Sequence, residues 1–128
     1  MSKLKYFKKN LAGNKNWGES FLGKLVDEHF WDKNEFWHLH AELTLYAIEH
    51  KHDFMLSRRL SAEVARMVYL IMITFAEHES SSEFHIIGVE HDELYDFIER
   101  VEHLTSAFFS GDILGEDSFD LQNPLLLE

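Results

Sequence analysis

Apolar residues recur along this chain with the spacing of helices. The longest charge-free run, residues 67–76, has charged residues on both sides, and the helical period extends from Arg58 to Glu79. We therefore predict a helix over residues 58–79 that is buried on most of its circumference and forms the central post of the fold. The run is too short to span a bilayer, which takes about 20 apolar residues.

Two further long helices have recognisable ends. Asp32 stands three residues before Glu35, which is the spacing of a capping box with Asp in place of Ser or Thr, and a helical pattern follows to residues 50–52. The polar stripe of this helix is narrow, so we expect neighbours on two sides of it. The last helix covers residues 90–110, and Gly111 suits the left-handed position that ends a helix.

The remaining segments are shorter or less regular. Residues 3–11 pattern as a short amphipathic helix, whereas residues 15–31 combine aromatics with Gly18 and Gly23 and are predicted to be an irregular or briefly extended cover for the core. Residues 84–88 are expected to be extended, and the tail 112–126 to be a loop that packs back on the body. The predicted fold is all-α: a compact single-domain helical bundle of three long helices plus a short N-terminal helix, with irregular covering segments.

Length and composition agree with one helical domain. The chain has 128 residues, 45% of them hydrophobic, with one proline and six glycines. We assign the domain to residues 1–126 and set aside Leu127 and Glu128, which are consistent with a cloning scar. The lack of cysteine excludes disulfides and thiolate chemistry and fits a reducing cytoplasm, and the N-terminus lacks the apolar segment of a secretory signal.

The charge distribution narrows the choice of partner. The net charge is −11, but residues 1–24 hold six of the 12 basic residues and one of the 23 acids, so the rest of the chain carries −16. Such a body repels nucleic-acid phosphates and anionic membranes and attracts a basic protein. Six acids form the predicted partner-binding surface, three on one face of the last helix and three in the tail: Asp92, Asp96, Glu99, Glu116, Asp117 and Asp120. Taken singly, each also has the simpler explanation of a solvated carboxylate.

Catalytic and metal motifs are missing from the sequence. It has no cysteine, no G-x-S-x-G element and no P-loop, so we predict no catalytic residue and no enzyme activity. Histidines two apart, as in 38/40 and 50/52, point to different helix faces, and the pair His38 and Glu42 has helical metal spacing without a third ligand. His40 and His50 lie on the apolar face, where a hydrogen-bonded core histidine is expected. We therefore predict no metal and no cofactor.

Four short stretches, spread in order along the chain, point to a family. They are residues 19–23 (ESFLG), 31–37 (WDKNEFW), 94–100 (LYDFIER) continuing to 108–111 (FFSG), and 118–119 (SF) with 123–126 (NPLL). In these stretches the chain resembles small immunity proteins of bacterial contact-dependent growth inhibition and polymorphic-toxin systems. Residues 51–83 match that family only in their hydrophobic pattern.

The resemblance implies an antitoxin in the bacterial cytoplasm that binds the C-terminal toxin domain of a cognate effector. Such proteins cover the toxin's active site, or an exosite beside it, without catalysis. The implied target is a nuclease, with a ribonuclease favoured, and the family supplies no residue-level site. Two other hypotheses stay open: a structural or regulatory module that self-associates through Trp17 and Trp37, and a histidine–carboxylate metal protein.

Overall fold

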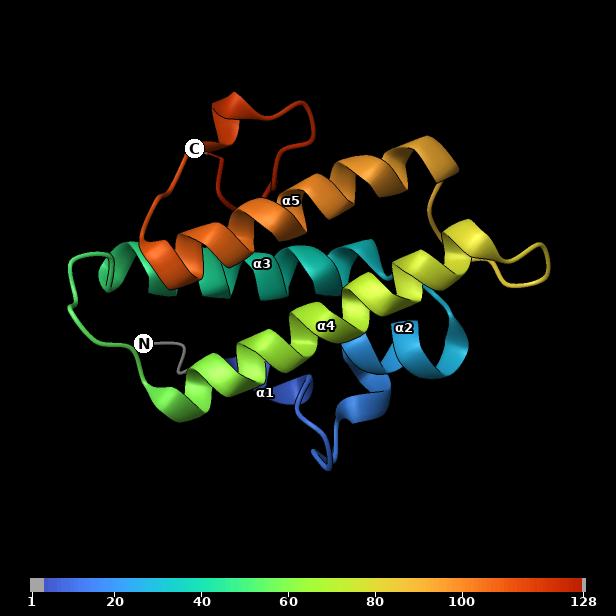
Figure 1. Ribbon diagram of the computed structural model, residues 1–128, viewed down its shortest axis with the longest axis horizontal. Coiled ribbons are helices and arrows are strands. Elements are labelled where there is room, and N and C mark those ends of the chain that lie inside the picture. Colours follow the sequence, from blue (N-terminus) through green and yellow to red (C-terminus); the bar gives the residue numbers. More distant parts are fainter. Residues whose placement is uncertain (1–3, 128) are drawn as a thin grey trace.

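A computed structural model of the protein describes residues 4–127. In this range the fold is all-α, as predicted (Figure 1). Lys3 of the predicted first helix and Glu128 of the proposed scar lie outside the described residues. Within residues 4–127 there are five α-helices and two short 3-10 helices: α1 (Lys5–Lys9), η1 (Trp17–Glu19), α2 (Phe21–Glu28), α3 (Lys33–Glu49), α4 (Arg58–Ser80), α5 (His91–Ser110) and η2 (Glu116–Ser118). No helix among these is both long and apolar enough to cross a membrane.

Side-chain caps mark the starts of α3 and α4, through Asp32 and Ser57. The carboxylate of Asp32 accepts the N–H of Glu35 at 3.0 Å, which confirms the predicted start of α3. In a capping box the Glu35 side chain would accept the backbone N–H of Asp32 in return. Here the Glu35 carboxylate instead pairs with Lys9 of α1 at 2.9 Å. At the other end of the chain α5 stops at Gly111, whose φ of 79° is the left-handed conformation expected there.

An aromatic cluster between α2, α3 and α5 forms the centre of the core. In Figure 1, α3 and α5 run alongside each other, with α4 crossing in front. The ring of Phe97 on α5 lies 5.1 Å from Phe36 of α3 and 5.2 Å from Trp31, measured between ring centroids. Phe21 of α2 adds edge-on contacts to both Trp31 and Phe36. Such pairs stabilise the fold beyond the area they bury, by about 0.5–1.5 kcal/mol each.

The prediction that residues 58–79 form a buried central post is wrong in one respect. The helix exists, but α4 buries a single stripe: Val64, Met67, Ile71, Thr74 and His78. Tyr69 and Ile73, on the opposite face, are 61% and 41% exposed. An uncharged residue is not necessarily a buried one, so the charge-free run did not show which face of the helix is buried. In the structure α4 packs mainly against α2 and α5, which cover only one side of it.

The prediction of an irregular cover over residues 15–31 is also wrong, because η1 and α2 occupy most of it. Ser20 caps α2 by accepting the N–H of Gly23 at 2.9 Å. A side chain on Gly23 would place its Cβ 1.9 Å from the carbonyl oxygen of Trp17. Gly23 therefore permits a close approach of η1 to α2, rather than marking a break. The prediction of extended backbone holds at Phe30, which forms an isolated parallel β-bridge with Ile87.

The two tryptophans named for self-association are unsuited to it. Trp37 is only 8% exposed and packs among the core aromatics. Trp17 is half-buried, and its ring N–H donates to Asp27 at 2.8 Å. An interface between copies of this chain would need other residues.

Candidate functional site

An exposed row of carboxylates follows the outer face of α5. Asp92, Asp96 and Glu99 are all solvent-exposed, and the seven helical steps from Asp92 to Glu99 cover about 10 Å of helix. The opposite face of α5 holds the core residues Leu94 and Phe97, so the helix is held rigidly from behind. None of the three acids forms a salt bridge with another residue of the described range 4–127. We call Asp92, Asp96 and Glu99 the α5 ridge.

Glu116, predicted to face a partner, instead turns inward. Its two carboxylate oxygens accept N–H groups of Arg100 at 2.9 and 2.7 Å, and the Arg100 side chain is fully buried. Burial alone would raise the pKa of Glu116, but the hydrogen bonds from Arg100 and from the backbone of Asn123 outweigh it and lower that pKa. Glu116 is therefore a structural ion-pair partner and leaves the candidate surface.

The Arg100–Glu116 pair clamps the tail beside the α5 ridge. Arg100 also donates to the backbone oxygen of Leu121 at 2.7 Å, and its guanidinium lies 3.9 Å from the centroid of the Phe119 ring. The prediction that the tail packs back on the body is thus confirmed, and Figure 1 shows it above α5. Asp117 and Asp120 stay exposed on this anchored tail. The structure therefore presents five of the six predicted acids from α5 and the tail clamped to it.

His40 lies beneath this clamp as the buried histidine that its apolar face predicted. Its Nε2 faces Arg100 at 3.3 Å and its Nδ1 faces the side-chain amide of Asn123 at 3.0 Å. Both neighbours are N–H donors. A protonated His40 ring would carry an N–H on each nitrogen, and each would face another donor instead of an acceptor. Burial, followed by the charge of Arg100, lowers the pKa of His40 to about 3. His40 is therefore a neutral structural residue. His50, by contrast, is half-buried and bonds to Asp53 at 2.6 Å.

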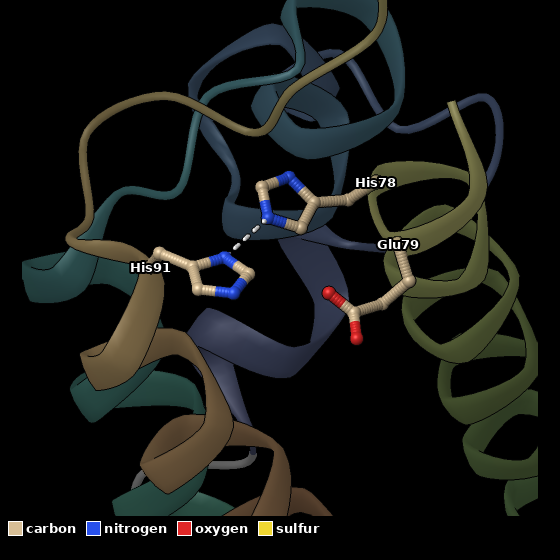
Figure 2. A group of neighbouring side chains, drawn as sticks. All are labelled: His78, Glu79 and His91. Atoms are coloured by element: carbon tan, nitrogen blue, oxygen red, sulfur yellow. Dashed lines mark hydrogen bonds between the residues drawn. The ribbon is translucent and has the colours of Figure 1, made fainter. Parts of the chain in front are cut away.

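A second cluster joins the end of α4 to the start of α5. His78, Glu79 and His91 offer ligand atoms that all lie within 4.8 Å of one another, and Figure 2 shows the three side chains converging. Two imidazoles and a carboxylate form a donor set suited to zinc. This is the one such group of His, Cys, Asp or Glu found in residues 4–127, and the sequence patterns did not identify it because His91 lies 13 residues after His78, outside the spacing of a helical pair.

The hydrogen bonds of this cluster disfavour the binding of a metal ion. The Ile86 N–H donates to Nδ1 of His78 at 2.9 Å, so the ring proton of neutral His78 sits on Nε2 and points to His91 at 3.2 Å. A metal bound at Nε2 would move that proton to Nδ1, against the Ile86 donor. Tyr95 also donates its hydroxyl to Glu79. The cluster is better described as a hydrogen-bonded junction between α4 and α5.

The spaced pair His38 and Glu42 likewise has a structural role. Both oxygens of Glu42 accept backbone N–H groups at the start of α1, from Tyr6 at 2.8 Å and Phe7 at 2.9 Å. The His38 ring stacks on Tyr6 with centroids 4.2 Å apart. Tyr6, His38 and Glu42 line a cleft of about 760 Å³, and the Glu42 carboxylate is already engaged in holding α1 on α3. Comparison with known proteins found no matching family model, curated protein or solved structure.

Proposed function

We propose that this protein is an immunity protein, which binds a cognate toxin domain in the bacterial cytoplasm and blocks it without catalysis. The observation that carries the proposal is the α5 ridge together with Asp117 and Asp120: five exposed carboxylates on a helix and on a tail that a buried ion pair holds to it. A nuclease, with a ribonuclease favoured, is the proposed target, because its active site must be basic to bind phosphates.

Inhibition follows from occlusion. Carboxylates on a rigid surface pair with the lysine and arginine side chains that would otherwise hold nucleic acid, and charge-assisted hydrogen bonds are the strongest of their kind. Rigidity matters because side chains that are already ordered lose less entropy on binding. The large negative charge also steers a basic partner to the surface, which raises the association rate.

The test is co-expression with the toxin domain encoded immediately upstream of this chain, followed by pull-down, a growth assay and titration. We expect a one-to-one complex and rescued growth. The triple variant D92K/D96K/E99K should raise the dissociation constant about 100-fold or more, since it puts like charges against the partner.

A matched control changes the same amount of charge elsewhere. Glu19, Glu28 and Glu83 are exposed and lie outside α5 and the tail, so E19K/E28K/E83K should bind nearly as the parent protein does. Thermal melts must accompany both variants, because Asp92 is in the first turn of α5 and favours that helix by about 0.3–1 kcal/mol. Equal binding by the two triple variants, or no rescue of growth by the parent protein, would refute the proposal.

A further inference from the structure

The outward face of α4 has the composition of an interface rather than of a solvent-facing helix. Opposite the buried stripe, successive turns present exposed residues that are mostly apolar: Ala62, Ala65, Arg66, Tyr69, Ile73 and Ala76. A helix that covers a core on one side is expected to be charged or polar on the other. Here the middle of that face carries Tyr69 and Ile73, which are 61% and 41% exposed.

The net charge along this helix changes sign from its first half, which holds Arg58, Arg59, Glu63 and Arg66, to its last turns, which hold Glu77 and Glu79. Arg58 and Arg59 stand at its start and are exposed, whereas Glu77 is exposed one turn before its end. Three of the six basic residues found after residue 24 lie in the first nine residues of α4, since Arg66 joins this pair. A helix with one basic end and one acidic end is complementary to itself when turned end for end.

We propose that α4 is the contact surface of an antiparallel, two-fold symmetric dimer of this chain. With the symmetry axis passing near Tyr69, Tyr69 meets its own copy and Ala62 lies against Ala76 of the other molecule. Arg59, which pairs with Glu63 of its own helix at 3.6 Å, also comes within side-chain reach of Glu77 of the other molecule, and symmetry repeats that contact at the far end. A two-fold interface requires one patch that complements itself, which this charge order satisfies.

The size of the surface indicates a weak dimer. A helix of 23 residues is about 35 Å long and about 10 Å wide, and its alanines allow the axes to approach to about 8 Å. Exposed apolar residues also flank α4 in the sequence: Phe54 and Met55 before it, 100% and 80% exposed, and Ile87 after it, 57% exposed. We expect an interface near the lower limit of specific ones and a micromolar dissociation constant.

This dimer is independent of the proposed toxin contact, because it uses α4 and not the α5 ridge. Sedimentation equilibrium of the full chain from about 1 µM to about 1 mM should show its mass rising from 15.1 kDa toward twice that value. Ile73→Asp should abolish the rise. Leu45→Asp is the matched control, since Leu45 is 56% exposed on α3 and outside the surface.

A charge exchange tests the antiparallel pairing itself. Arg59→Glu gives α4 an acidic residue at both ends, and Glu77→Arg gives it a basic residue at both ends, so each variant alone should dimerise about ten-fold or more weakly. An equimolar mixture of the two variants should dimerise like the parent protein, because both pairs then join opposite charges.

Three results would overturn the proposal. They are a parent protein that stays at 15.1 kDa throughout, equal effects of Ile73→Asp and Leu45→Asp, and a mixture of R59E and E77R that associates no better than either variant alone. Circular dichroism of each variant shows whether it is folded, so that loss of the dimer is separated from loss of structure.

Discussion

At the scale of single residues, the buried charge of Arg100 is the feature most sensitive to change. Its side chain is fully buried, and Glu116 is its only carboxylate partner in the described part of the chain. Glu116→Gln leaves that charge uncompensated, so the free energy of unfolding should fall by about 3–5 kcal/mol. Asp117→Asn, one residue on and exposed, should change it by less than about 0.5 kcal/mol. Urea titration of both variants measures the difference, and equal effects would contradict the clamp.

His40 predicts how stability depends on pH. Its pKa is lowered to about 3 in the folded protein, whereas an unfolded histidine titrates near 6.5. The unfolded state therefore binds the extra proton as pH falls below about 6.5, and stability is lost progressively down to about pH 3. Between pH 7 and 5 this one group should cost about 2 kcal/mol.

Unfolding titrations at these two pH values check the sign and size of the effect. His40→Gln removes the titrating group and should flatten the dependence by that amount, although it lowers stability at both pH values. His52→Gln, at an exposed loop position, is the control. An unchanged slope in H40Q would show that other groups cause the loss in acid.

At the scale of elements, the junction of η1 with α2 depends on the lack of a side chain at Gly23. Alanine is intrinsically the better helix residue by about 1 kcal/mol, but here its Cβ would lie 1.9 Å from the Trp17 carbonyl oxygen. The clash should win, and Gly23→Ala should destabilise the protein by about 1–3 kcal/mol. Gly18→Ala meets no atom within 4 Å and should be nearly neutral. Stabilisation by G23A in urea titrations would contradict this account.

At the scale of the whole molecule, the charge of −11 gives the two proposed contacts opposite responses to salt. Two such bodies with centres about 30 Å apart repel by roughly 17 kcal/mol in unscreened water and by less than about 1 kcal/mol at 0.15 M salt. The α4 dimer should therefore strengthen from 20 mM to 150 mM salt, whereas association with a basic toxin should slow. Sedimentation and stopped-flow association measure the two trends, and a dimer that weakens over this range would contradict the prediction.

Local signals in the sequence determined the all-α class, the starts and ends of the three long helices and the exposure of the α5 ridge. Caps act within one turn and helical periodicity acts along one segment, so Asp32 and Gly111 needed no knowledge of distant residues. Tertiary structure alone decided that α4 buries only one stripe and that Glu116 faces Arg100. Each of these depends on contacts between segments far apart in the chain, such as His40 with Arg100, and a pattern of apolar and charged residues does not encode which partner a side chain will meet.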